Sequence, residues 1–259
     1  MTTDDRLPPS AYSAARSSIE MWRIWAGSIP GARMEERPGA AAVVTGLDSV
    51  HHNGVWVARR RIRAATVHEL LDVVEAADVP YALQLRGGAP PAVVGAARAH
   101  GMVLEAEEPL MVLTSKTRLH DAAHATGLSI RTLEPDEGAL LASVTVPVFG
   151  GAAELTAASA NARVLSHPAV RCYVGEVRDK IVATAIGVTL SGTTAIFDVA
   201  TLPRHRRRGY GSALTARAVL DGLAAGARWA WLEASEGAVG VYERLGFRTV
   251  ETGATWVRE

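Results

Sequence analysis

One segment of the chain, residues 193–227, limits the possible folds more than any other. It begins with the apolar run TTAIFDVAT, continues with the glycine- and arginine-rich stretch LPRHRRRGYG, and ends with SALTARAVLDGLAAGA. Apolar residues recur at helical spacing in the last part, at Ala213, Ala216, Leu220 and Leu223. The segment therefore predicts a strand, a basic loop (residues 202–211) and a helix, an order typical of α/β and α+β folds.

The basic loop concentrates positive charge, with Arg or His at every position from 204 to 208, in a chain without formal net charge. Backbone N–H groups at the start of a helix are unpaired and carry partial positive charge. Gly209 and Gly211 allow a ligand to approach this backbone closely. We therefore expect the loop to bind the phosphate or diphosphate group of a small molecule.

Two familiar phosphate-binding loops do not fit this segment. A Walker-type loop needs Lys followed by Ser or Thr after its last glycine, but Ser212-Ala213 stands there. A dinucleotide fingerprint needs a third small residue where this chain has Leu214. A nucleic-acid-binding loop is a further alternative; the lack of interleaved aromatic residues and the 27 basic against 27 acidic residues argue against it.

Composition excludes several other classes of protein. A single cysteine, Cys172, allows neither an internal disulfide nor a cysteine-rich zinc site, and its apolar surroundings predict a buried strand thiol. His51-His52 lack a convergent third ligand, so we expect them to be exposed and expect no metal. The acidic start MTTDD and the absence of a long apolar run predict a cytoplasmic protein without a membrane partner.

The rest of the chain predicts two α/β halves: residues 1–115, a polar linker at 116–127, and residues 128–259. In the first half, we expect a hairpin turn at Asn53-Gly54 between two strands. In the second, we expect a helix at 133–144, a loop at 145–151 and a helix at 150–165. The remaining expected helices are 12–27, 66–76, 90–101 and 236–246, and the strands are 41–46, 54–58, 81–86, 107–114, 170–177, 180–190, 193–201, 228–235 and 247–259.

The pattern Arg206-x-x-Gly209-x-Gly211 after a strand resembles the pyrophosphate-binding motif of the GNAT superfamily of acyl-CoA N-acyltransferases. The segment from Tyr242 to Phe247, YERLGF, is similar to the family's YxxLGF motif. This resemblance covers residues 128–259. The first half, with its NGV at 53–55, resembles the degenerate partner domain of tandem members. The fold implied is a GNAT-like mixed, mostly antiparallel sheet flanked by helices, with a smaller degenerate N-terminal domain.

The resemblance also implies site residues, with acetyl-CoA as co-substrate. The pantetheine arm is expected along Val199, Ala200 and Thr201, and the amide near Val199 is expected to face the thioester carbonyl. The expected cradle of the pyrophosphate is formed by Arg206, Arg207, Arg208, Gly209, Tyr210, Gly211 and Ser212.

Proton transfer is expected from Tyr242, as the acid that protonates the leaving thiolate. No carboxylate stands at Ala195, where some relatives carry glutamate, so the base is expected to be Glu233 or Asp198. Ser235 replaces an asparagine common in the family, which removes the basis for a CoA contact there.

The activity implied is transfer of an acetyl group to a small-molecule or peptide amine, by a monomer or homodimer. The amine is expected beside residues 145–151, which include Phe149, with Trp22 and Trp25 as further candidates; core packing is favoured for all three aromatics. A non-catalytic acyl-CoA-binding or regulatory module is the alternative function, supported by the missing carboxylate.

Overall fold

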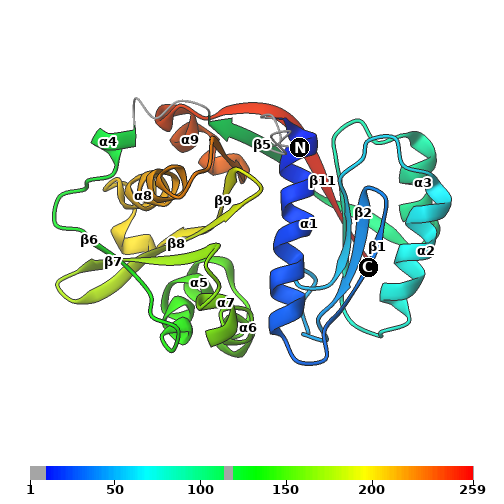
Figure 1. Cartoon of the computed structure of the whole chain (residues 1–259), viewed down its shortest axis with the longest axis horizontal. Helices are drawn as coiled ribbons and strands as arrows, with labels where there is room; N and C mark the ends of the chain where they lie inside the picture. The colour runs from blue at the N-terminus through cyan, green and yellow to red at the C-terminus, as the bar shows by residue number, and fades with distance from the viewer. Residues whose placement is uncertain (1–9, 114–118, 259) are drawn as a thin grey trace, which may run out of the picture. The chain divides into compact units, whose positions relative to one another are not determined.

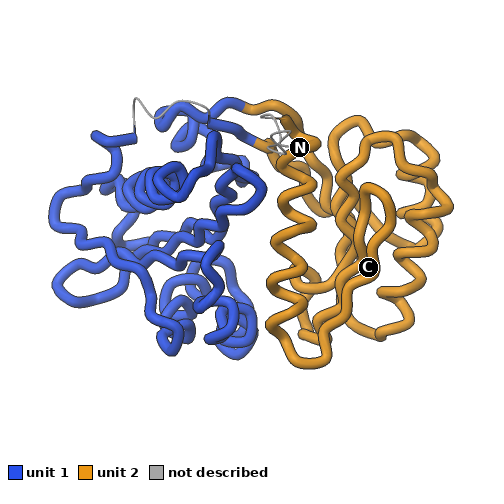
Figure 2. Tube along the Cα trace, viewed as in Figure 1, with its two compact units in different colours: residues 1–9, 111–248 blue, residues 10–110, 249–259 orange. Residues whose placement is uncertain are grey.

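The computed structural model describes residues 10–113 and 119–258. They form two compact units (Figure 2). Unit 1 contains residues 111–248, and unit 2 contains residues 10–110 and 249–259. This division differs from the expected boundaries at the C-terminus, because the last strand hydrogen-bonds to β4 (Ala82–Leu85) and so belongs to unit 2.

The expected linker also differs from the structure. Residues 116–118 lie outside the described residues. The next residues form helix α4 (Leu119–Ala122), whose Leu119 is fully buried in the core of unit 1. This segment is therefore part of a packed unit.

Unit 2 is a sheet with α1 (Ala11–Ser28) on one face and α2 (Ala64–Glu75) and α3 (Pro91–Ala99) on the other (Figure 1). Its strand order is β1-β2-β3-β4-β11-β5. The bounds are β1 Arg33–Arg37, β2 Ala40–Val44, β3 Gly54–Val57, β4 Ala82–Leu85, β5 Met102–Leu113 and β11 Arg248–Arg258. Strand β2 pairs antiparallel with β1 and with β3, and β4 pairs antiparallel with β11, whereas β3 and β4 run parallel.

The expected two-residue turn at Asn53-Gly54 is wrong. Gly54 is already the first residue of β3, and the connection from β2 is longer. Asn53 is fully buried instead; its Oδ1 accepts hydrogen bonds from the loop at Thr45 and Gly46, and its Nδ2 donates one to the carbonyl of Pro80. Gly54 has a φ of 153°, and a Cβ there would overlap the Ala82 carbonyl oxygen, so this position requires glycine.

Unit 1 has the strand order β10-β9-β8-β7-β6, with α8 on one face and α5, α6 and α7 on the other (Figure 1). Strands β9 and β10 run parallel, whereas β6–β7, β7–β8 and β8–β9 pair antiparallel. The helices are α5 (Ala142–Phe149), α6 (Ala153–Ser159), α7 (Ala162–Leu165), α8 (Tyr210–Ala224) and α9 (Val239–Leu245), and the strands are β6 (Ser129–Thr132), β7 (Val170–Val177), β8 (Lys180–Leu190), β9 (Thr193–Thr201) and β10 (Trp229–Glu233); 3₁₀ turns lie at Gly138–Leu141, Pro203–His205 and Glu236–Ala238.

Four expected features of unit 1 need correction. The expected helix at 133–144 begins later, because residues 133–137 are not helical, Gly138–Leu141 form a 3₁₀ turn and α5 starts at Ala142. The expected loop at 145–151 is largely helical, since α5 continues to Phe149 and includes Pro147. The expected single helix at 150–165 is two helices, because Asn161 caps the start of α7. The expected apolar stripe of α8 is only partly right: Ala213 and Ala216 are buried, whereas Leu220 and Leu223 are half-buried.

The structure is a mixed α/β fold with a mostly antiparallel sheet flanked by helices, as predicted. A helix crosses over between parallel strands in each unit: β3-α2-β4 in unit 2 and β9-α8-β10 in unit 1. No helix in the described ranges is both long and apolar enough to cross a membrane.

Candidate active site

The candidate site lies in unit 1, where β9 and β10 part. The two strands pair in parallel only from Thr193–Trp229 to Ala195–Trp231. Residues 196–201 of β9 and 232–233 of β10, which we call the strand fork, lie beyond the last pairing between these two strands. At the fork, β9 continues to pair with β8 on its other edge.

A bulge in β9 bends the strand at the fork. The register between β8 and β9 shifts between Thr184 and Ile186, and Asp198 has a φ of 50°. The hydroxyl of Thr184 donates a hydrogen bond of 3.1 Å to the Asp198 carbonyl, which holds the bulge. Val199, Ala200 and Thr201 follow it; Ala200 is buried and the other two are half-buried.

The basic loop leads from the fork to α8. Gly209 caps the helix with a φ of 79° and has open space around its Cα. Within the described structure, the backbone N–H groups of residues 207–212 donate no hydrogen bond, and the first donor of the helix is Ala213, to the Gly209 carbonyl. A run of unpaired N–H donors at the start of a helix is the arrangement that can bind an anion.

The side chains of the loop differ in their contacts and exposure. Arg206 donates from Nε to the Thr201 carbonyl at 3.1 Å, which braces the loop against the end of β9. Arg207 and Arg208 are exposed. Tyr210 is buried in the core of unit 1, so only its backbone can contact a ligand, and Ser212 is half-buried. His205 packs near the Tyr210 ring, with 6.5 Å between ring centroids.

Tyr242 lies on α9 and is only 7% exposed. Its ring meets Phe247 edge-on at a centroid distance of 6.0 Å. Burial raises the pKa of its phenol to about 12, so the hydroxyl keeps its proton at neutral pH. This is the protonation state that a general acid needs.

The two candidate bases are both exposed. Ala230 and Leu232 of β10 pack into the core with α8, and side chains alternate along a strand, so Glu233 points to the opposite face. That face also carries Trp231, whose ring contacts Phe197 edge-on at 5.5 Å. Ser235, after β10, is exposed as well.

The expected cysteine and the three expected aromatic residues differ in how far they are buried. Cys172 is 2% exposed and burial raises the pKa of its thiol to about 12, which confirms a buried strand thiol. Phe149 is 60% exposed, so the favoured core packing is wrong for it. Trp22 packs against Trp56 in unit 2 with ring centroids 4.4 Å apart, which confirms core packing. Trp25 is also buried.

The histidine pair is only partly as expected. His51 is exposed, but His52 is half-buried and hydrogen-bonds through Nδ1 to the Ser49 hydroxyl at 2.9 Å. Burial lowers the pKa of His52. The sequence did not reveal the bulge at Asp198 or the parting of β9 and β10, because both depend on pairing between distant segments.

Comparison with known proteins identifies a matching family model and similar folds. Residues 146–247 match the model of the acetyltransferase (GNAT) family. No curated protein matches the chain significantly. A GCN5-related N-acetyltransferase from Kribbella flavida has a similar structure, with a TM-score of 0.71, 20% identity, and coverage of 97% of this chain and 96% of that chain.

Two further solved structures share the fold over nearly the whole chain. A GCN5-related N-acetyltransferase from Sphaerobacter thermophilus has a TM-score of 0.61 and 18% identity, with 96% of this chain and 89% of that chain covered. A tandem GNAT protein from the clavulanic acid biosynthesis pathway has a TM-score of 0.59 and 15% identity, with 98% and 97% covered. These likenesses show the fold, and the match to the acetyltransferase (GNAT) family model covers residues 146–247.

Proposed function

We propose that this protein is an N-acetyltransferase that moves an acetyl group from acetyl-CoA to a primary amine within a ternary complex. One observation carries the proposal: unit 1 combines a strand fork with unpaired N–H groups at residues 207–212. The amide groups of the pantetheine arm can hydrogen-bond to a strand edge without a neighbouring strand, and a diphosphate needs several converging donors. The two features follow one another in the chain.

The loop suits the diphosphate of the coenzyme. Unpaired N–H groups and the dipole of α8 supply directed positive charge, and the exposed Arg207 and Arg208 add charged donors. Arg206 is held by Thr201, so its role in our proposal is mainly to fix the loop. The carbonyl of Thr201 is thereby already engaged, which leaves Val199 and Ala200 as the main backbone partners of the pantetheine arm.

The chemistry follows from the residues at the fork. An amide near Val199 would stabilise the oxyanion that forms when the amine attacks the thioester carbonyl. The new C–N bond forms, the C–S bond breaks, and Glu233 or Asp198 accepts the proton lost by the amine, directly or through water. Tyr242 then protonates the departing thiolate. The exposed Phe149 is proposed to contact the amine.

A non-catalytic acyl-CoA-binding module is the second candidate, because Ala195 offers no carboxylate and both candidate bases are exposed. The two functions share the coenzyme site and differ only in turnover. A screen of small-molecule and peptide amines for release of free thiol distinguishes them. Thiol release that depends on the amine supports the enzyme; binding of acetyl-CoA without any turnover across the screen supports the binding module.

The coenzyme site is tested by calorimetric titration with acetyl-CoA and with S-acetylpantetheine, which lacks the diphosphate. We expect saturable binding of acetyl-CoA and much weaker binding of S-acetylpantetheine. Replacing both Arg207 and Arg208 by alanine should reduce this difference in affinity, because it removes charged donors to the diphosphate. The fold should be unaffected, since both side chains are exposed. Absence of heat with acetyl-CoA, or equal affinity for both compounds, would overturn the proposal.

A further inference from the structure

Unit 2 contains a pocket of about 280 Å³ that is separate from the site in unit 1. One wall is the face of α1 that carries Tyr12, Arg16 and Ile19. The other wall is the turn between β1 and β2, together with Ala58 and Arg59, which directly follow β3. The pocket therefore lies at the C-terminal end of β3, between this end and α1.

This pocket cannot take an acyl-CoA arm in the way proposed for unit 1. In unit 1, β9 and β10 pair over three residue pairs and then part. In unit 2, the corresponding parallel strands β3 and β4 pair along their whole length, from Gly54–Ala82 to Val57–Leu85. No strand edge is open there in the described structure, so the charged groups of the pocket walls decide which ligand the pocket can bind.

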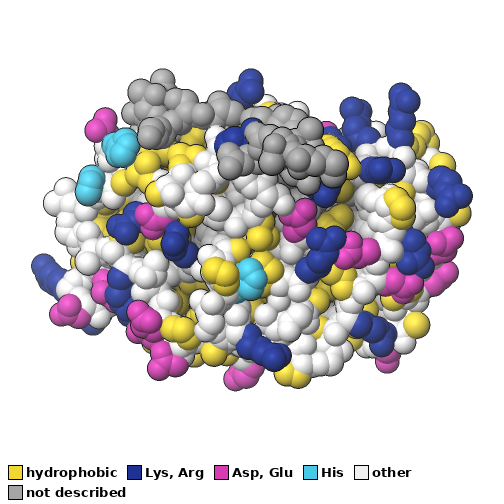
Figure 3. Space-filling view, in the orientation of Figure 1, with side chains coloured by type: hydrophobic (Ala, Val, Ile, Leu, Met, Phe, Trp, Pro, Cys, Tyr) yellow, Lys and Arg dark blue, Asp and Glu magenta, His cyan; other side chains and the backbone are white. Residues whose placement is uncertain are grey.

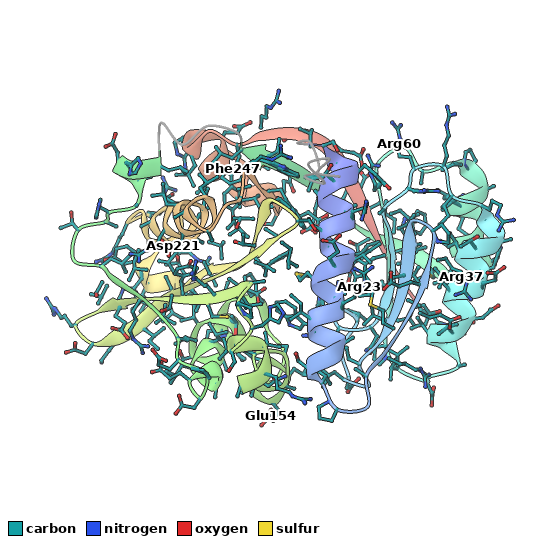
Figure 4. The ribbon with its side chains drawn as sticks, viewed as in Figure 1. Arg23, Arg37, Arg60, Glu154, Asp221 and Phe247 are labelled. Atoms are coloured by element: carbon teal, nitrogen blue, oxygen red, sulfur yellow. The ribbon has the colours of Figure 1, made fainter. Side chains whose placement is uncertain are left out.

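Part of that charge is already neutralised. Arg23 donates from Nε and Nη2 to both carboxylate oxygens of Glu36, each at 2.6 Å. This pair lowers the pKa of Glu36 and raises that of Arg23. Arg37 contacts Glu35 at 2.6 Å and Glu69 at 3.6 Å (Figure 4 labels Arg23 and Arg37). These residues form fixed walls and leave little free charge.

Two arginines of the pocket keep their charge available. Arg59 makes no ion pair with a carboxylate in residues 10–113 and 119–258, and Arg16 has only a 3.5 Å contact with Glu20. Figure 3 shows basic and acidic side chains interspersed over the surface of unit 2.

The backbone around Gly39 holds Arg59 in place. The Gly39 carbonyl accepts hydrogen bonds from the N–H groups of Ala58 and Arg59, at 2.8 and 3.1 Å. The Arg59 side chain crosses Gly39 so closely that a Cβ at Gly39, which has a φ of 91°, would overlap it. The absence of a side chain at Gly39 therefore allows the Arg59 side chain to lie along the pocket wall.

The geometry points to a binding site for a small organic carboxylate. Its charged group would pair with Arg59 and Arg16, since guanidinium groups bind carboxylates with directed hydrogen bonds. Its apolar part would lie against Tyr12 and Ile19, of which Ile19 is 7% exposed. The volume is at the lower limit for small-molecule sites, which favours a ligand of about one aromatic ring.

The test uses the full chain and benzoate as the probe, with binding followed by calorimetry and ligand-detected NMR. Benzyl alcohol serves as the neutral analogue and inorganic phosphate as an anion without an apolar part. We expect saturable benzoate binding, at least tenfold weaker binding of benzyl alcohol, and weaker binding of phosphate. Equal affinity for benzoate and benzyl alcohol, or preference for phosphate, would overturn the carboxylate site.

Matched variants locate the binding. Arg59→Ala should weaken benzoate roughly tenfold to hundredfold, the equivalent of losing a charge-assisted hydrogen bond. Arg61→Ala removes an equally exposed arginine that does not line the pocket, and should leave the affinity unchanged. Equal losses in both variants would indicate unspecific attraction and refute the site. Acetyl-CoA titration of the same variants should match the unmodified protein, so this test does not depend on the activity proposed for unit 1.

Discussion

Tyr242 is the residue whose replacement best separates chemistry from binding. Tyr242→Phe keeps the ring that packs against Phe247 and removes only the hydroxyl. If the phenol is the general acid, kcat should fall about 100-fold or more, because positioned proton transfer contributes about that much. The Kd of acetyl-CoA, measured by calorimetry, should change by less than about twofold. A variant with unchanged kcat would show that Tyr242 only packs the helix.

Asn53 gives a prediction about stability at the same scale. Asn53→Ala leaves buried partners without hydrogen bonds, among them the N–H of Thr45 and the carbonyl of Pro80. We expect a loss of about 3 kcal/mol in the free energy of unfolding, measured with urea. The control is Asn161→Ala, which removes an N-cap and should cost about 1 kcal/mol. Similar small losses in both variants would contradict this role of Asn53.

At the scale of elements, variants in the basic loop and at the start of α8 allow the effects on stability and on ligand binding to be measured separately. Gly209 requires its positive φ, so Gly209→Ala should cost about 1–2 kcal/mol of stability. Gly211 lies inside the helix, and an added Cβ would meet Thr201 Oγ1 and Val199 Cγ1 at 3.6 Å, an ordinary contact. Gly211→Ala should therefore not lower stability, because alanine is the better helix former.

For binding of acetyl-CoA, we expect the larger effect from Gly211→Ala, the variant that does not lower stability. The methyl group of Gly211→Ala would stand between α8 and the end of β9, where the coenzyme has to approach, so the Kd of acetyl-CoA should rise about tenfold or more. Thermal unfolding without ligand and calorimetry with acetyl-CoA measure the two effects independently. Retained affinity in Gly211→Ala would place the coenzyme elsewhere.

The same elements show what the sequence could and could not predict. Strands β7, β8 and β9 were predicted to the residue, because their apolar runs end at turn residues. Strand β1 (RMEER) was missed because it has almost no apolar residues; its pairing with the buried β2 stabilises it. Pro147 made α5 look like a loop, although the turn after it still forms, with the Gly150 N–H donating to the Val146 carbonyl.

In the candidate site too, locally encoded features were predicted, whereas features that depend on distant pairing were not. The loop and its glycines are local and were predicted from the motif. The strand fork is not local: it depends on β10 pairing with β9 as far as Ala195 and no further. The face on which Glu233 lies became clear only from the packing of Ala230 and Leu232.

At the scale of the whole molecule, buried tyrosines predict a loss of stability at alkaline pH. Burial raises the pKa of Tyr242 to about 12 from an ordinary value of 10.0, and burial also raises the pKa values of Tyr81 and Tyr173. Above about pH 10 the unfolded chain loses these protons while the folded chain keeps them. The contribution of these phenols to the free energy of unfolding should therefore be complete below pH 10 and fall as the pH rises from 10 to 12.

Urea unfolding at several pH values measures this effect. In Tyr242→Phe the decline between pH 10 and 12 should be less steep than in the unmodified protein, since one of the three phenols is gone. Tyr12→Phe is the control, because it removes a half-buried phenol that is not among the buried core residues, and its profile should match the unmodified protein. An equal slope in all three proteins would mean that the burial of Tyr242 does not persist in solution.

The last prediction concerns how the chain divides. Strand β11 lies between β4 and β5 in the sheet of unit 2, and its Trp256 belongs to the core of that unit. Arg86 of unit 2 forms a bidentate pair with Glu251 of β11, at 2.9 and 2.6 Å, with both side chains largely buried. A cut after residue 113 therefore removes a central strand from unit 2 and leaves the edges of β4 and β5 unpaired.

We accordingly expect a fragment of residues 10–113 to show no cooperative unfolding transition. The same fragment with residues 249–259 attached through a long flexible linker should fold, because it regains β11 and its buried side chains. Glu251→Ala in the linked fragment should lower its stability, since Arg86 would keep a charge in a largely buried place without its partner. Circular dichroism during thermal unfolding measures all three, and a cooperative transition in residues 10–113 alone would show that β11 is dispensable for unit 2.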